Sequence, residues 1–108
     1  MARYLLQVGI KSETYALMMQ NPQDRGKAVR PVFEAVGGSL EEYYFAVGEN
    51  TVYLVCELPD LAGLEAITMA VLAGGAIESI KATGILTAQE TVDVMKKAGD
   101  VVYKPPAK

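Results

Sequence analysis

The sequence contains no histidine and only one cysteine among its 108 residues. Without histidine there can be no imidazole general base, no Ser-His or Cys-His catalytic pair and no histidine-ligated metal. The single thiol, Cys56, rules out an intrachain disulfide and leaves too few ligands for a structural zinc site. We therefore expect no metal and no cofactor, so any chemistry must depend on carboxylates, tyrosines, basic side chains or shape.

Positive charge and long apolar runs are also scarce. The net charge is −3, and no basic run is longer than Lys96-Lys97, which argues against a nucleic-acid partner or an anionic membrane. No segment approaches the roughly 20 apolar residues of a membrane span. The first ten residues, interrupted by Gln7 and Gly9, make a poor signal peptide. Together with the single cysteine, these features favour a cytoplasmic location.

Apolar residues are what the chain has in abundance. They make up 51% of the sequence, which is too many for a disordered chain. A chain of 108 residues has the size of one domain, and such a domain buries roughly 65% of its unfolded surface. The composition suggests more apolar surface than one small core can hide. We expect a single domain over residues 1–97 and a C-terminal tail over residues 98–108.

Periodicity predicts the order of the elements. Apolar alternation predicts strands over residues 2–10, 39–47, 51–58 and 76–86. Helical spacing and glycine pairs predict two main helices, one between Pro22 and Gly37 and one from the N-cap Asp60 to Gly74. A short helix capped by Ser12 precedes them.

Two local features sharpen the helix predictions. Thr87-x-x-Glu90 is a capping box that opens a last helix through about Lys97. Pro31 removes one helical hydrogen bond, so it predicts either a kink or a helix that begins near Arg30.

The stretch "YYFAVGENTVYLVCELPD", residues 43–60, reads as a hairpin followed by a helix start. A turn at residues 48–51 places Val47 opposite Val52 and makes Glu42 and Glu57 direct cross-strand neighbours. Cys56 then falls on the core face, where a thiol is inert.

This order predicts an α+β fold: a ferredoxin-like βαββαβ arrangement with a four-stranded antiparallel sheet and a C-terminal helix. Right-handed crossovers put both main helices on one face of the sheet. The other face carries apolar residues that no helix remains to cover; they are Leu5, Tyr44, Ala46, Tyr53 and Val55. A large apolar patch usually marks an interface, so we expect two sheets to stack across a twofold axis in a homodimer.

Three stretches, "ARYLLQVG", "VFEAVGGSLEEYYFAVGEN" and "LVCELPD", resemble the GYD-domain family, and the resemblance covers roughly residues 2–95. It implies a small ferredoxin-like protein that pairs into a dimeric α/β barrel, in a family of largely unknown function. The family's naming turn is Gly-Tyr-Asp or Gly-x-Tyr-Asp. Gly48 matches the glycine, but Asn50 and Thr51 stand where tyrosine and aspartate are expected.

Four residues are candidates for ligand binding: Arg3, Glu42, Tyr44 and Tyr53. Phenols can donate hydrogen bonds, and a desolvated carboxylate can act as a neutral-pH acid, although each residue is more simply a strand residue with a wet polar end. Arg3, Arg25, Lys27 and Arg30 could gather an anion, but the three on the helix are most simply an ordinary solvated face. No catalytic residue is identifiable.

The leading hypothesis is a cytosolic homodimer that binds a small ligand or serves a structural role. The alternative is a metal-free dimeric-barrel enzyme, of isomerase or oxygenase type, acting on a small aromatic or carbonyl compound. In that reading Tyr44 or Glu42 transfers protons and Arg3 orients an anion. A regulatory module that recruits a partner through its tail is a third possibility.

Overall fold

A computed structural model describes residues 1–107 of the chain. Its centre is a four-stranded antiparallel sheet in the order β2-β3-β1-β4. The strands are β1 (Ala2–Ile10), β2 (Ser39–Phe45), β3 (Thr51–Leu58) and β4 (Ile77–Ile85). They agree with the predicted strands to within two residues at each end, and β2 and β4 form the edges. The predicted α+β, ferredoxin-like sheet is therefore confirmed.

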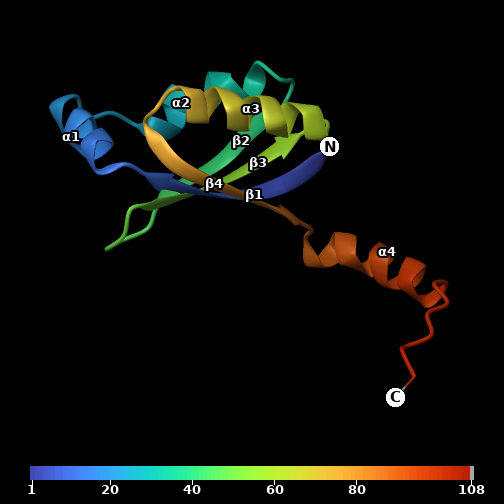
Figure 1. Ribbon diagram of the computed structural model, residues 1–108. Coiled ribbons are helices and arrows are strands. Elements are labelled where there is room, and N and C mark those ends of the chain that lie inside the picture. Colours follow the sequence, from blue (N-terminus) through green and yellow to red (C-terminus); the bar gives the residue numbers. More distant parts are fainter. Residues whose placement is uncertain (108) are drawn as a thin grey trace.

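Four helices accompany the sheet, and two of them cover one face (Figure 1). They are α1 (Ser12–Gln20), α2 (Arg25–Glu34), α3 (Leu61–Ala73) and α4 (Ala88–Gly99). Helix α2 begins where the Asp24 carboxylate accepts a hydrogen bond from the Lys27 amide. It continues through Pro31, so the predicted start near Arg30 is wrong. The Asp24 cap and the burial of Phe33 outweigh the one hydrogen bond that proline removes.

The hydrophobic core lies between the sheet and α2 and α3. The core residues come from alternate positions of the strands. This is clearest in β3, where alternate residues from Val52 to Leu58 are all less than 10% exposed. Phe33 from α2 and Ile67 from α3 close this core from above. Cys56 lies within it with no exposed surface, as the alternation predicts.

The hairpin register differs from the prediction by two residues. Phe45, not Val47, lies opposite Val52, and Tyr44 lies opposite Tyr53. The loop is longer than the predicted turn, and it is closed by a 2.9 Å hydrogen bond from the Ala46 amide to the Thr51 carbonyl. A shift of two residues keeps each side chain on its predicted face.

A β-bulge between Leu40 and Glu42 adds a second change. The two-residue shift already places Glu42 opposite Val55, and the bulge then places Glu57 opposite Ser39. The predicted Glu42–Glu57 cross-strand pair is therefore wrong. The extra residue in a bulge moves the following pairs out of step, and periodicity alone does not reveal it.

The C-terminal helix stands away from the rest of the chain. Figure 1 shows α4 leaving the end of β4 and projecting beyond the sheet. The molecule is 58 Å long with a radius of gyration of 17.5 Å, whereas a compact chain of this size has a radius near 13 Å. Within residues 1–107, no helix lies over the sheet face opposite α2 and α3, which we call the far face.

After α4 the chain has no regular structure from residue 101 to residue 107. The last residue of the predicted tail, Lys108, lies outside the described residues. None of the helices described combines the length and the apolar character needed to cross a bilayer.

Candidate functional site

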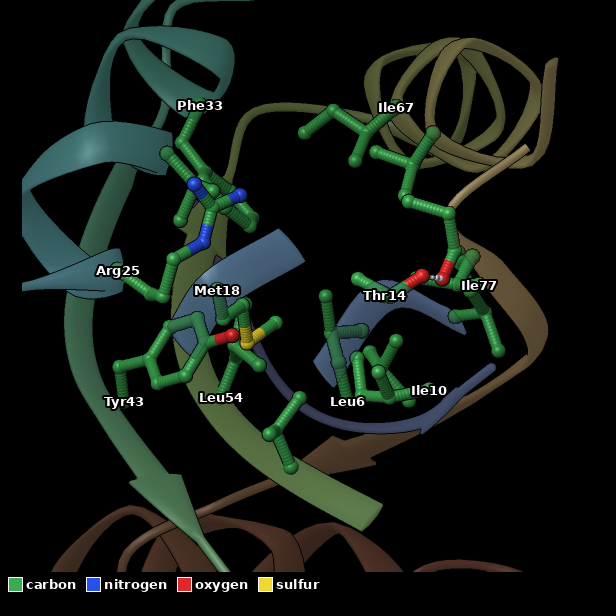
Figure 2. Close-up of a pocket in the computed structure, with 16 residues that line it drawn as sticks. Leu6, Ile10, Thr14, Met18, Arg25, Phe33, Tyr43, Leu54, Ile67 and Ile77 are labelled. Atoms are coloured by element: carbon green, nitrogen blue, oxygen red, sulfur yellow. Dashed lines mark hydrogen bonds between the residues drawn. The ribbon is translucent and has the colours of Figure 1, made fainter. Parts of the chain in front are cut away.

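An apolar cavity of about 130 Å³ lies between the sheet and the helices (Figure 2). Helix α2 packs on β2, whereas α3 packs on β4 and β3, and the cavity lies between the two helices above the central strands. Its walls include Leu6 and Ile10 from β1, Phe33 from α2 and Ile67 from α3. An engineered cavity of roughly 150 Å³ with similar walls holds benzene. The cavity is therefore the size of one aromatic ring or a short alkyl chain.

Three polar side chains reach this apolar space: Thr14 from α1, Arg25 from α2 and Tyr43 from β2 (Figure 2). The Thr14 hydroxyl donates to the Ala76 carbonyl and is satisfied. The Arg25 Nε–H is buried and has no hydrogen-bond partner within the described chain. An unmatched buried donor costs free energy. The Arg25 Nε–H is therefore a donor in this cavity that lacks an acceptor, although the same guanidinium also hydrogen-bonds the Tyr43 hydroxyl.

Tyr43 supplies a neutral hydroxyl. Burial raises the pKa of its phenol, and the positive charge of Arg25 opposes that rise only in part. The phenol therefore stays protonated at neutral pH and can donate a hydrogen bond.

An outer groove of about 280 Å³ adjoins the cavity and shares four wall residues with it: Thr14, Met18, Arg25 and Ala76. The remaining groove residues include Asn21 and Gln23, which are both exposed. Arg25 therefore lies at the junction between an apolar interior and a groove that is open to solvent and has both polar and apolar walls. Such a junction suits a molecule with one charged end and one apolar end.

The sequence Asp24-Arg25-Gly26 fixes Arg25 at this junction. Asp24 sets the first turn of α2, and the buried Gly26 lets that turn approach β2 closely. A Cβ atom at Gly26 would lie 3.4 Å from the Tyr43 Cβ and 3.1 Å from the Asp24 Oδ1. A Cβ atom there would be in ordinary contact with Tyr43, but it would crowd the Asp24 carboxylate that caps the helix beside Arg25.

The predicted candidate Arg3 lies at the opposite end of the sheet from this cavity, within a group of three carboxylates. Its guanidinium donates to Glu90 at 2.9 Å and to Glu57 at 3.2 Å, and its Nε is 3.7 Å from Glu41. The hydrogen bond to Glu90 is the main cause that raises the Arg3 pKa. In this chain Arg3 therefore joins β1, β3 and the bulge of β2 to the first turn of α4.

The other three candidates share the far face of the sheet. Tyr44 lies directly opposite Tyr53, and Glu42 lies two residues along the same strand. The Tyr44 side chain is 57% exposed, and the neighbouring Glu42 carboxylate raises its pKa. The structure thus brings Glu42, Tyr44 and Tyr53 together on an open surface.

The sequence was compared with known families and with curated proteins. The GYD domain matches residues 4–95, which is most of the chain. This chain belongs to the GYD-domain family. No curated protein matches it.

In this GYD-domain chain the residues at the naming turn have structural roles. Gly48 has a φ of 88°, a left-handed conformation that glycine adopts without strain. The Asn50 side chain donates to the Ile10 carbonyl at 3.1 Å and to Glu78 at 2.7 Å. Asn50 therefore ties the hairpin to the end of β1 and to β4.

Two further residues define what the chain can do chemically. Burial raises the pKa of the Cys56 thiol to about 11, so it is not a reactive nucleophile at neutral pH. Across residues 1–107, no group of three or more histidine, cysteine, aspartate or glutamate side chains is arranged so that it could hold a metal ion. Sequence pattern favours a solvated face for Arg25, with Lys27 and Arg30, over a role in anion binding, and it does not reveal the contact of Arg25 with an apolar cavity. The signal was the pair of neighbours, a helix cap before Arg25 and a glycine after it.

Proposed function

We propose that this GYD-domain protein is a homodimer that binds a small monocarboxylic acid with an aromatic ring or a short aliphatic chain. The observation that carries the proposal is the buried, unpartnered Arg25 Nε at the junction of the cavity and the groove. The carboxylate would lie against Arg25, and the apolar part would enter the cavity beside Leu6 and Ile67.

The energetics of binding favour a ligand with a carboxylate at one end and an apolar group at the other. A carboxylate forms a bidentate, charge-assisted pair with a guanidinium, which an alcohol or amide cannot match. Each buried CH₂ group adds about 0.8 kcal/mol. For a ligand of about nine non-hydrogen atoms we expect a Kd on the order of 0.1 mM.

Paired acids and alcohols test the proposal. We expect benzoate and hexanoate to bind at least tenfold more tightly than benzyl alcohol and 1-hexanol in calorimetric or NMR titrations. Arg25→Gln should remove that preference, whereas Arg30→Gln, an exposed position on the same helix, should leave it unchanged. Equal binding of acid and alcohol by the unaltered protein would contradict the proposal.

The homodimer is proposed from the far face of the sheet. Leu5, Tyr53 and Val55 lie side by side there and are only partly covered by their own chain. Stacking two such faces across a twofold axis would bury them. Sedimentation should give about twice the 11.6 kDa chain mass, and a monomer at micromolar concentration would count against it.

A cytoplasmic location belongs to the same proposal. It is supported by the single thiol, which is buried and unpaired, since a reduced cysteine suits a reducing compartment.

A metal-free isomerase or oxygenase acting on a small aromatic or carbonyl compound is the alternative function. It is supported by the gathering of Glu42, Tyr44 and Tyr53 on the face that a second copy would enclose. Tyr44, protonated at neutral pH, would be the proton donor, and Arg3 would orient an anion. Turnover that survives Arg25→Gln but is lost in Tyr44→Phe would favour this alternative over the acid-binding protein.

A further inference from the structure

The acid-binding function proposed above gives a role to Arg25 but none to the hydroxyl of Tyr43. Tyr43 lies in β2 opposite Leu54, on the helix-covered face of the sheet. Figure 2 shows its ring reaching in from β2, with the hydroxyl at the inner end, on the side of the cavity that Met18 lines. The phenol is therefore a polar group within an apolar space, and its hydrogen bonds limit what else can bind there.

Packing fixes the position of the Tyr43 ring. The Phe45 ring lies against it, with the two ring centroids 5.4 Å apart and the ring planes tilted by 46°. The backbone of α2 is also close, since a Cβ atom at Gly26 would lie 3.4 Å from the Tyr43 Cβ. A side chain that is held in place before a ligand arrives loses little conformational freedom on binding.

Arg25 and Tyr43 together present two hydrogen-bond donors. The guanidinium donates a hydrogen bond to the phenol, and its charge also acts on that group. A guanidinium has donors only, so the phenol oxygen accepts this bond and the phenol proton is left for another acceptor. The Arg25 Nε–H is buried and also has no partner within residues 1–107. One charged donor and one neutral donor are therefore available side by side.

The walls around these donors supply no carboxylate. Among residues 1–107, neither the cavity nor the adjoining groove is lined by an aspartate or a glutamate. The remaining polar side chain of the cavity is Thr14, whose hydroxyl donates to the Ala76 carbonyl. A ligand that brings matching acceptor oxygens would remove the free-energy cost of the unmatched donors.

The separation of the two donors specifies the arrangement of those oxygens. A guanidinium nitrogen and a phenol oxygen that share a hydrogen bond lie about 3 Å apart. A carboxylate in a bidentate pair with the guanidinium uses both of its oxygens, so the phenol needs a third acceptor. A keto oxygen on the next carbon lies beside a carboxylate oxygen at a similar separation. A hydroxyl at that carbon would bring a proton of its own, which must also find an acceptor.

We propose that the acid bound in this cavity is a 2-oxo acid, whose keto oxygen accepts a hydrogen bond from the Tyr43 hydroxyl. The inference rests on the acid-binding function proposed above and adds the group that Tyr43 recognises. The carboxylate pairs with Arg25, and the aliphatic chain or ring enters the cavity beside Leu6 and Ile67.

Matched ligands test this assignment in the full chain. In calorimetric titrations we expect 2-oxohexanoate to bind about fivefold more tightly than hexanoate, which is the effect of one neutral hydrogen bond. Benzoylformate should exceed phenylacetate by a similar factor. Tyr43→Phe removes only the hydroxyl, so it should abolish both gains and leave hexanoate binding unchanged. Tyr4→Phe is the matched control, because Tyr4 is a partly buried tyrosine of the same sheet face that does not line the cavity.

A second measurement follows the hydrogen bond itself. In 2-oxohexanoate labelled with carbon-13 at the keto carbon, the carbonyl resonance should move downfield on binding to the unaltered protein, because the donor polarises the C=O group. The same movement should be absent with Tyr43→Phe and present with Tyr4→Phe.

The outcomes separate this inference from the function on which it rests. If hexanoate binds more tightly than 1-hexanol but the keto group adds nothing, the 2-oxo assignment is wrong and the acid-binding function stands. An equal gain from 2-hydroxyhexanoate would also overturn the assignment, because the site would then accept a hydroxyl as well. If Tyr43→Phe weakens hexanoate as much as 2-oxohexanoate, the phenol bonds the carboxylate instead. Equal binding of hexanoate and 1-hexanol would overturn both proposals.

Discussion

The two faces of the sheet come from the same strands but have different surroundings. On β3, the residues from Val52 to Leu58 that point to the helices are at most 6% exposed. Their alternates, including Tyr53 and Val55, are only partly buried. Both sets contain large apolar side chains, yet only one set has helices above it. Alternation along a strand identifies which residues share a face of the sheet. It does not determine whether helices or another chain bury that face.

The largest expected effect is on the helix-covered face. Leu58→Ala removes a side chain with no exposed surface, and it should lower the free energy of unfolding by about 2–5 kcal/mol. Val55→Ala, on the same strand but on the far face, should cost about 1 kcal/mol, because that side chain is partly exposed. Chemical denaturation measures both. Equal losses would mean that the two faces do not differ as described.

A charge on the far face should affect assembly next. Val55→Asp should weaken the proposed dimer about 100-fold, or about 2.7 kcal/mol, because it places an unpaired carboxylate between two apolar faces. Sedimentation across a concentration series measures the shift. Ala62→Asp, an exposed position on α3, is the control. A dimer that tolerates Val55→Asp would place the contact elsewhere.

The helix that leaves the sheet should respond to its cap. The Thr87 hydroxyl accepts a hydrogen bond from the Glu90 amide at 3.0 Å, and the Glu90 carboxylate accepts one from the Thr87 amide at 2.8 Å. Thr87→Ala should cost about 1 kcal/mol and raise amide exchange roughly fivefold in α4 but not in β1 or β3. Gln89→Ala, in the same turn, should change neither. Exchange that rises throughout the sheet would show that α4 is part of the core.

The smallest expected effect is a loss of stability in α4 when the pH is lowered. The hydrogen bonds from the Thr87 amide and from Arg3 hold the pKa of Glu90 below its ordinary value of 4.5. A carboxyl whose pKa is lowered in the folded protein stabilises it above the ordinary pKa, and loses that contribution as pH falls through the lowered value. Amide protection in α4 should therefore decline as the pH falls below the ordinary value of 4.5 and through the lowered pKa of Glu90. Glu90→Gln should make that decline disappear, and a persistent decline would assign it to another carboxylate.

Most of the fold follows from sequence pattern. Alternation located all four strands, the Thr87 and Asp60 caps located two helix starts, and their order gave the ferredoxin-like sheet. These features are predictable because each depends on residues close together in the chain. The bulge at Glu41 and the two-residue shift of the hairpin were not predictable, because loop closure and cross-strand hydrogen bonds decide them.

The candidate site was harder to predict than the fold. Arg25, Lys27 and Arg30 are three basic residues of the same helix, and the sequence gives no sign that Arg25 differs from the other two. Only the close packing of α2 on β2 brings Arg25 to an apolar cavity. Tyr43 lies opposite Leu54 on the core face of the sheet, but its contact with a cavity depends on the gap between two helices. The roles of Arg3, Glu42, Tyr44 and Tyr53 remain predictions, since their placement on one face does not test them.

The short helix α1 has a consequence for how a ligand would gain access. It forms one wall of the groove through Thr14, Leu17 and Met18, yet it contains no fully buried residue. Segments with few buried contacts open at the lowest free energy. Of the elements that line the cavity, α1 should therefore need the least free energy to move away. The rate of ligand uptake should then follow the opening of this helix, while the sheet and α3 stay closed.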